Sequence, residues 1–362
     1  MPLTPHDATD VTVELFNHCA GTCTGCVLSS LERKAVKPVM SVADFATAMQ
    51  ALAQHGQQTG LDYRVVLVFG DVPALPLDQQ LGYYDAVKEA GLQLGLTMTF
   101  ATEGKDAEYR SSLDEVLSRF PDAVFDITVD PFRLERYPAY AARVLEAANR
   151  APILHLAALL SDKVMQQYSP KALTECFETY LPGRPMQLGF TPATSFLDKR
   201  NYGYEVDSAA AYARDFYRLS GTNRDHFGRE LERFESRGDY TDFMGQTFHI
   251  GAGLELFPVA YSMFGDLILD QRNGGKPIGV LQPGQSLSDL LGAASARRFG
   301  VYNAMGMDKG DSEFGCASCE WREACTFNGV GLARHLYRGF ENKLGSCYGP
   351  ADLIDETAGA AA

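Results

Sequence analysis

The chain has 362 residues, of which 46% are hydrophobic and 22% charged, and its formal net charge is −14. These fractions are typical of a globular protein, and the length suits a large domain with a smaller one. The acidic balance argues against nucleic acid as a partner, because nonspecific binding needs cationic side chains that neutralise phosphates. Every apolar run is shorter than the roughly 18 residues that cross a bilayer, so no membrane partner is expected. The amino-terminal segment lacks the basic start and apolar core of a signal peptide, and the expected location is the cytoplasm.

Short apolar runs alternate with amphipathic stretches between about residues 10 and 195. The predicted strands are Val11–Phe16, Arg64–Phe69, Gln93–Phe100, Ala123–Val129, Ile153–Ala158 and Met186–Phe190. The predicted helices between them lie near residues 42–55, 77–90, 111–119, 136–149 and 169–181. Strand and helix in regular succession predict an α/β fold with a parallel sheet and helices outside it. A doubly wound sheet and an incomplete barrel both fit the pattern, and in both folds ligands bind at the carboxyl ends of the strands.

The pattern changes after the sixth predicted strand. A long, charge-rich helix is predicted over residues 207–237, and a domain boundary is predicted near residue 240. Beyond it the sequence predicts a β-rich segment, a turn and a helix, at Phe248–Asp270, Gly274–Pro277 and Leu287–Tyr302. The expected organisation is a first domain over residues 1–240, a second over 241–355 and a disordered tail over 356–362.

Seven of the eight cysteines fall into two groups at opposite ends of the chain, which in a reducing cytosol favours metal binding over disulfides. Cys176 stands alone on a helix-like pattern and is interpreted as a packing residue. The first group is Cys19, Cys23 and Cys26, spaced C-x3-C-x2-C directly after the first predicted strand. Three thiolates can hold three irons of a [4Fe–4S] cluster and leave the fourth iron open. Zinc is the alternative, although structural zinc takes four ligands and no fourth ligand is evident nearby.

This cysteine run, placed after the first strand of a βα-repeat chain, resembles that of radical S-adenosylmethionine (SAM) enzymes. The resemblance implies a partial (β/α)6 TIM-like barrel and a [4Fe–4S] cluster on Cys19, Cys23 and Cys26. It also implies that SAM chelates the open iron and is reductively cleaved to a 5′-deoxyadenosyl radical, which abstracts hydrogen from a C–H bond. Gly25 departs from the family, which commonly has an aromatic residue before the third cysteine.

The segment after the second predicted strand is Gly70, Asp71, Val72 and Pro73. It is similar to the Gly-Gly-Glu-Pro-like segment that meets the SAM amino group in this family, with the carboxylate and proline in altered order. A carboxylate and backbone carbonyls at a strand end can receive an ammonium group. The alternative is a plain turn.

Four further polar residues near the ends of the third and fourth predicted strands are candidates to line the same mouth and bind SAM. They are Thr99, Thr102, Asp126 and Asp130. Ligands bind where parallel strands end, which is the reason for considering these residues. The alternative is that each is an ordinary polar residue at a strand end.

The second cysteine group has the spacing C-x2-C-x5-C followed by a distant cysteine, which leaves zinc and iron–sulfur both open. With the nearby Trp321-Arg322 it resembles the SPASM extension found after many radical SAM cores. The resemblance implies one auxiliary [4Fe–4S] cluster, held by Cys316, Cys319, Cys325 and Cys347. Ligands for a second auxiliary cluster are missing, since the hairpin region lacks cysteine and position 329 is glycine. The expected cofactors are therefore two [4Fe–4S] clusters and SAM.

The hairpin region that lacks the cysteines carries His249, Glu255 and Asp266. In the space that a missing cluster leaves, these residues are candidates for substrate contact or proton removal. The alternative is that each is a surface or structural residue.

The leading hypothesis is a radical SAM oxidoreductase that crosslinks or oxidises a peptide or protein, as many SPASM-type relatives do. A separate leader-binding protein would then be a partner, because residues 1–10 are too short for a leader-binding domain. An electron donor such as flavodoxin or ferredoxin is also expected. One alternative is dehydrogenation or epimerisation of a small metabolite, such as a sugar or amino acid. An alternative of another class is an iron–sulfur or zinc carrier.

Overall fold

The computed structural model describes most of the amino-terminal half of the chain and part of the remainder. The described residues are 8–16, 39–68, 70–100, 102–184, 186–190, 212, 215, 216, 218–220, 248–262, 265–268 and 277–291.

Six strands of the described chain pair in parallel, each beside the next in sequence. They are β1 (Thr9–Glu14), β2 (Tyr63–Val68), β3 (Gln93–Met98), β4 (Val124–Val129), β5 (Ile153–Leu160) and β6 (Gln187–Phe190). Their bounds lie within two residues of the predicted ones. This agreement is expected because runs of β-branched and aromatic side chains fit the pleated surface of a strand.

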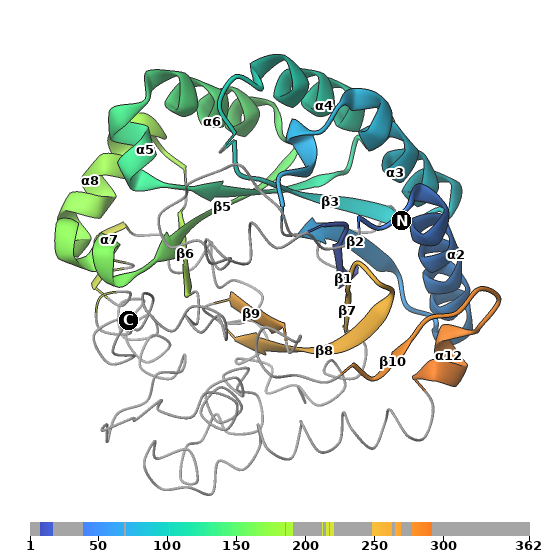
Figure 1. Ribbon diagram of the computed structural model, residues 1–362. Helices are drawn as coiled ribbons and strands as arrows, with labels where there is room; N and C mark the ends of the chain where they lie inside the picture. The colour runs from blue at the N-terminus through green and yellow to red at the C-terminus, as the bar shows by residue number, and fades with distance from the viewer. Residues whose placement is uncertain are drawn as a thin grey trace, which may run out of the picture.

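Helices follow the strands and cover one side of the sheet. They are α2 (Val42–Thr59), the 3-10 helix η1 (Val72–Ala74), α3 (Leu77–Glu89), α4 (Asp106–Arg119), α5 (Pro131–Arg136), α6 (Pro138–Arg150), α7 (Asp162–Gln167) and α8 (Pro170–Tyr180). Figure 1 shows α2, α3, α4, α6 and α8 on the outer, convex side of a curved sheet. A doubly wound sheet has helices on both faces, so the described chain is the incomplete barrel.

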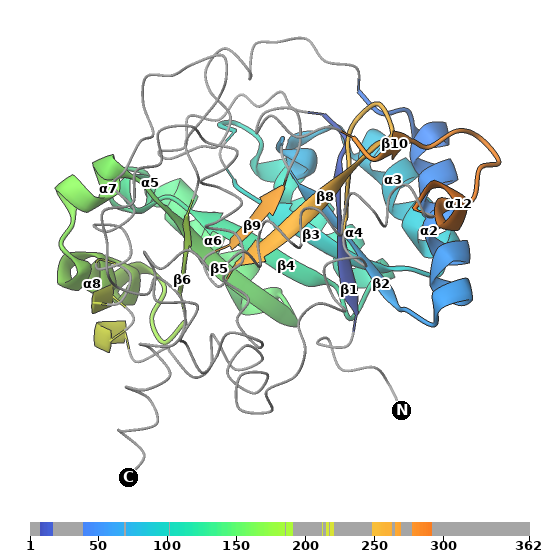
Figure 2. The ribbon, with the colours of Figure 1, turned by 90° about the horizontal axis from the view of Figure 1, so that it is seen from below.

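The described strands beyond residue 247 extend the same sheet on the other side of β1. β7 (Phe248–Ile250) pairs in parallel with β1, and β8 (Glu255–Ser262) pairs antiparallel to β7. β9 (Gly265–Ile268) and β10 (Gly279–Val280) both pair with β8, and α12 (Leu287–Leu290) follows. In Figures 1 and 2, β8 and β9 lie opposite β4 and β5, so the sheet curls around its concave face. The predicted boundary near residue 240 therefore precedes strands that continue the barrel sheet.

The two faces of the sheet differ in chemistry because side chains alternate along each strand. On β1, Val11 and Val13 are fully buried and belong to one hydrophobic core with helix residues such as Phe45 of α2. Thr12 and Glu14 alternate with them and therefore face the concave side. The convex face is thus the apolar core of the barrel, and the concave face carries polar groups.

Cys176 lies in α8 and is 7% exposed, within that core. Burial raises the pKa of its thiol to about 12, with a smaller contribution from the Glu135 carboxylate. A thiol held protonated is a poor nucleophile and a poor metal ligand, as the packing interpretation of Cys176 requires.

Candidate active site at the carboxyl ends of the strands

The chain that leaves β1 at Phe16 returns to the same place. The backbone N–H of Met40 donates to the Leu15 carbonyl at 2.9 Å, and the Tyr83 hydroxyl donates to the Met40 carbonyl at 2.7 Å. These bonds hold the described residues on either side of the intervening segment at the carboxyl end of β1. The predicted ligands Cys19, Cys23 and Cys26 belong to this loop and lie outside the described residues, as do Cys316, Cys319, Cys325 and Cys347.

Gly70 begins the turn after β2 and packs directly against the start of the cysteine loop. Its φ is +67°, a left-handed conformation that favours glycine. A Cβ at this position would lie 2.5 Å from the Phe16 ring and 2.9 Å from the Phe16 carbonyl oxygen. Only glycine lets the two segments approach this closely.

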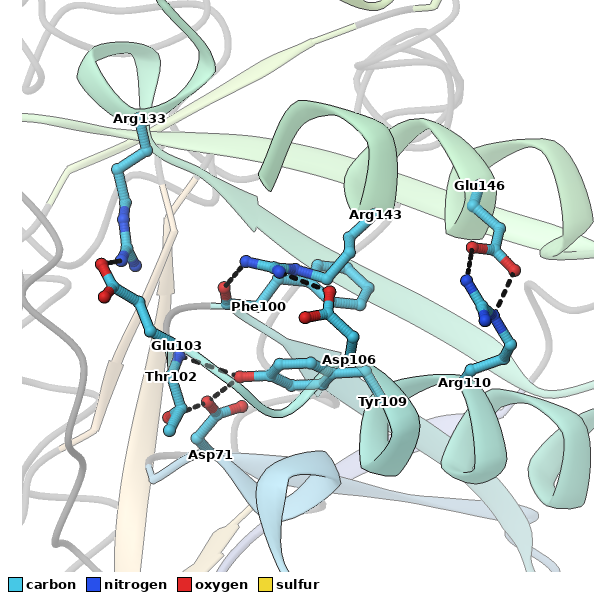
Figure 3. A network of polar contacts seen from close by, with 10 residues as sticks. All are labelled: Asp71, Phe100, Thr102, Glu103, Asp106, Tyr109, Arg110, Arg133, Arg143 and Glu146. Atoms are coloured by element: carbon cyan, nitrogen blue, oxygen red, sulfur yellow. Dashed lines mark hydrogen bonds and ion pairs between the residues drawn. The ribbon is translucent and has the colours of Figure 1, made fainter. Parts of the chain in front are cut away.

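Asp71 follows in the turn and is 4% exposed. Its Oδ2 accepts hydrogen bonds from the Thr102 hydroxyl at 2.6 Å and from the Tyr109 hydroxyl, which in turn accepts from the Thr102 backbone N–H at 3.0 Å (Figure 3). Its Oδ1 has no hydrogen-bond partner within the part of the chain that the structure describes. Buried carboxylate oxygens are normally paired, so this atom is available to a ligand.

Burial raises the pKa of Asp71, and hydrogen bonds from Thr102 and Tyr109 oppose the rise. Burial has the larger effect because removing a carboxylate from water disfavours its charged form. A cationic group at Oδ1 would offset that cost and restore the ionised form.

The loop after β3 that carries Thr102 is held by α6. Its Phe100 adopts φ +49°, which is unusual for a residue with a side chain. Arg143 of α6 donates to the Phe100 carbonyl at 3.3 Å and to Asp106 Oδ1 at 2.6 Å, across the start of α4 (Figure 3). These contacts place Thr102 and Tyr109 against Asp71.

The other residues predicted to bind SAM do not all lie near Asp71. Thr99 is near Asp71, and its buried hydroxyl has no hydrogen-bond partner among the described residues. Asp130 caps α5, where its Oδ1 accepts from the backbone N–H of Phe132 at 3.0 Å. Asp126 lies inside β4 and contacts His155 of β5, a residue that the sequence pattern did not indicate. Thr99 and Thr102 therefore gather around Asp71, whereas Asp126 and Asp130 have other partners.

The three candidates of the hairpin occupy three different environments. His249 of β7 is fully buried, with Nδ1 3.0 Å from the Thr12 hydroxyl and Nε2 3.6 Å from Glu14 Oε2. The Glu255 carboxylate folds back over the tight turn before β8 and accepts from the Gly253 N–H at 2.9 Å. Asp266 lies in β9, with Tyr261 of β8 as its cross-strand partner. The polar neighbours of His249 thus lie on β1.

Neither a further metal site nor a membrane-spanning helix is found among the described residues. They contain no group of three or more His, Cys, Asp or Glu side chains that could hold a metal ion. Every predicted cluster ligand lies beyond them, so this finding concerns only other sites. No helix in the described part of the chain is long and apolar enough to cross a membrane.

Comparisons with known proteins find similarity in structure and none in sequence. No protein-family model matches the chain, and no curated protein matches it. Native anSMEcpe with bound AdoMet, another abbreviation of SAM, aligns with a TM-score of 0.58 at 9% identity, over 97% of this chain and 99% of that one. Native anSMEcpe with bound AdoMet and Cp18Cys peptide gives 0.56 at 9% identity, over 98% and 99%. Streptococcus suis SuiB bound to precursor peptide SuiA gives 0.53 at 11% identity, over 88% and 71%. At these identities the shared feature is the fold, which is the one that the resemblance to radical SAM enzymes predicted.

Proposed function

We propose that the chain is a radical SAM enzyme that abstracts hydrogen from a C–H bond of a peptide or protein. The observation that carries the proposal is the buried Asp71 carboxylate at the carboxyl end of β2, whose Oδ1 has no hydrogen-bond partner among the described residues. Gly70 beside it packs on Phe16, the residue from which the chain continues toward Cys19. A carboxylate next to a three-thiolate loop is suited to a ligand that has both an ammonium group and a metal-chelating end.

The described residues fit SAM on chemical grounds. Asp71 Oδ1 is an unpaired acceptor, and its partners Thr102 and Tyr109 hold the carboxylate in place from the other side. Cys19, Cys23 and Cys26 would hold the first [4Fe–4S] cluster, and Asp71, with Gly70, Val72 and Pro73 of the same turn, would receive the SAM amino group. When bound, the cluster and SAM supply a 5′-deoxyadenosyl radical.

The chain's own contribution is orientation and exclusion of water. Gly70 and Phe16 close the space between the two loops, and Thr99 and Thr102 surround the carboxylate with hydroxyl groups. A buried polar site of this kind strengthens hydrogen bonds to a charged ligand, because the local dielectric is low. The site thus favours one orientation of the bound amino group.

The peptide class of substrate is supported by the structures that share the fold. Two of them contain peptides, the Cp18Cys peptide in anSMEcpe and the precursor peptide SuiA in SuiB. An electron donor such as flavodoxin or ferredoxin and a separate leader-binding protein complete the proposal. Cys316, Cys319, Cys325 and Cys347 would hold the auxiliary cluster, which would supply an electron acceptor.

The test is anaerobic reconstitution of the full chain followed by SAM and dithionite, with 5′-deoxyadenosine measured by chromatography. The expected result is 5′-deoxyadenosine from the wild type and none from a Cys19→Ala, Cys23→Ala, Cys26→Ala variant. Cys176→Ala is the matched control and should keep its iron and its activity. Wild-type protein with verified clusters that makes no 5′-deoxyadenosine would contradict the enzyme and favour an iron–sulfur carrier.

Metal analysis tests the number of clusters separately. Two [4Fe–4S] clusters require about eight irons per chain. About four irons with stoichiometric zinc would reassign Cys316, Cys319, Cys325 and Cys347 to a zinc site, because four thiolates also suit structural zinc.

A further inference from the structure

Asp126 and His155 form a polar pair in the middle of the parallel sheet. They are cross-strand partners on β4 and β5, and His155 Nδ1 lies 3.0 Å from Asp126 Oδ1. Thr97 of β3 is the partner of Asp126 on the other side, so three polar residues form one row across three strands. The surrounding residues of β5 are apolar, in the sequence Ile-Leu-His-Leu-Ala-Ala-Leu-Leu.

The pair faces the inside of the barrel. On β4, Phe125 and Ile127 are buried in the core that the sheet shares with the helices. Asp126 stands between them and therefore points to the opposite face. The helices lie on the convex side (Figure 1), so Asp126 and its partner His155 face the concave side.

The pair is accessible and lies deeper than the Asp71 turn. The side chains of His155 and Asp126 are 32% and 36% exposed, although both lie within strands of a sheet that is covered outside. Asp126 precedes the end of β4, whereas Asp71 follows the end of β2. Ala157, two residues after His155 on the same face, has a small side chain. The pair is therefore placed to contact a molecule that enters the barrel.

A carboxylate beside one ring nitrogen of a histidine determines whether the other ring nitrogen donates or accepts a hydrogen bond. Asp126 accepts the Nδ1–H of His155, an assignment made from this contact, which leaves Nε2 as a hydrogen-bond acceptor. An acceptor nitrogen of this kind binds N–H and O–H groups.

We propose that Asp126 and His155 bind the substrate, with His155 Nε2 accepting a hydrogen bond from an N–H or O–H group close to the carbon that loses hydrogen. The inference rests on the proposed radical SAM function and assigns Asp126 to the substrate in place of SAM. Peptides supply such donors on the backbone and on hydroxyl-bearing side chains.

The first experiment separates the substrate from SAM as the ligand of the pair. Binding of SAM to the reconstituted full chain is measured for His155→Gln and Asp126→Asn. The expected dissociation constants lie within about twofold of the wild type, because neither side chain contacts SAM. A rise of about tenfold or more, the loss of one charge-assisted hydrogen bond, would make the pair SAM ligands and overturn the proposal.

The second experiment measures whether the imidazole is open to a ligand. The folded full chain is treated with diethyl pyrocarbonate, which acylates neutral imidazole, and the modified histidines are located by mass spectrometry. His155 should react with and without SAM, whereas His249, which is fully buried, should not react. An unreactive His155, or one that SAM protects, would overturn the proposal.

None of these measurements needs turnover, so their outcomes can be distinguished from that of the 5′-deoxyadenosine test. A reactive His155 in a chain that makes no 5′-deoxyadenosine would overturn the proposed enzyme function. An unreactive His155 in an active chain would overturn only the proposed role of Asp126 and His155.

Discussion

At the scale of single residues, the site depends on Asp71 and on the glycine before it. Asp71 receives hydrogen bonds from Thr102 and Tyr109, which lie about thirty to forty residues later in the chain, so the fold and not the local turn holds the carboxylate. Gly70 is required by its positive φ and by the close approach of Phe16. The two adjacent residues thus have different roles: Gly70 allows close packing, and Asp71 is the proposed binding residue.

Asp71→Asn should weaken SAM binding by about tenfold or more, because the amide replaces a charged acceptor at Oδ1 with a neutral group. Binding is measured by equilibrium titration on the reconstituted protein. Asp114→Asn is the matched control, since Asp114 lies on α4, pairs with Arg150 and is 57% exposed. Equal affinities of the wild type and Asp71→Asn would remove Asp71 from the site.

The raised pKa of Asp71 predicts a pH dependence of stability in the protein without ligands. A carboxyl whose folded pKa exceeds its unfolded value costs stability when ionised, and the cost disappears as the pH falls through the folded pKa. The wild type should therefore gain stability relative to Asp71→Asn as the pH falls from 7 toward 4. Denaturant unfolding of both proteins across this range measures the difference between their free energies of unfolding. A wild type that loses stability relative to Asp71→Asn as the pH falls would contradict the burial argument.

Gly70→Ala should destabilise the fold by about 2–4 kcal/mol, the sum of left-handed strain and overpacking against Phe16. Gly91→Ala isolates the strain, because Gly91 has φ +70° and a Cβ there would meet nothing within 4 Å. That control should lose only about 1 kcal/mol. Chemical denaturation gives both values, and equal losses would show that the contact with Phe16 is unimportant.

At the scale of elements, the loop between β3 and α4 is positioned by a helix that follows the next strand. Arg143 of α6 reaches both the Phe100 carbonyl and Asp106 at the start of α4, and its side chain in the ion pair is 13% exposed. The regular order of strand and helix brings α4 and α6 side by side on the convex face (Figure 1). The site is therefore supported from the outer layer of the barrel.

Arg143→Met should loosen this loop while the barrel remains folded. Hydrogen exchange of the backbone amides at residues 102–105 should increase, and SAM should bind more weakly, because Thr102 loses its fixed place beside Asp71. Arg110→Met is the control: Arg110 also pairs between helices, with Glu146, but it is 62% exposed and such pairs contribute little. Unchanged exchange in Arg143→Met would show that Tyr109 alone holds the loop.

At the scale of the whole molecule, strands far apart in sequence complete one sheet. β7 pairs with β1, so the His249 side chain packs between Thr12 and Glu14 although more than 230 residues separate them. A second connection joins α12 to α2, where the Ser288 hydroxyl lies 2.8 Å from His55 Nδ1. The strand that leads into the cysteine loop is thus paired on both sides, with β2 and with β7.

His249→Ala should lower the free energy of unfolding by about 2–4 kcal/mol, because it leaves a cavity and removes a buried partner of Thr12 and Glu14. His55→Ala, at the half-buried contact between α2 and α12, should cost about 1 kcal/mol. Hydrogen exchange in β1 should rise only in the first variant. Protection of β1 that is unchanged in His249→Ala would contradict the pairing with β7.

The sequence alone determined the alternation of strand and helix, because apolar periodicity records which face of each element is buried. The resemblance to radical SAM enzymes also indicated the segment at Gly70 and Asp71, although the residues alone fit a plain turn equally well. The apolar pattern could not choose between a doubly wound sheet and a barrel, because both bury the same pattern, whereas the resemblance to radical SAM enzymes predicted the barrel. The tertiary structure confirmed that prediction, by placing the helices on one side (Figure 1).

The partners of the polar residues were likewise decided by tertiary structure. Tyr109 reads as a core position of a helix, and His155 as an isolated polar residue in an apolar strand, yet each contacts a candidate carboxylate. Such contacts depend on strand register and on the packing of helices across the sheet, which no local pattern encodes. The sequence determines the chemistry of each side chain, whereas the fold determines which side chains contact one another and so form a site.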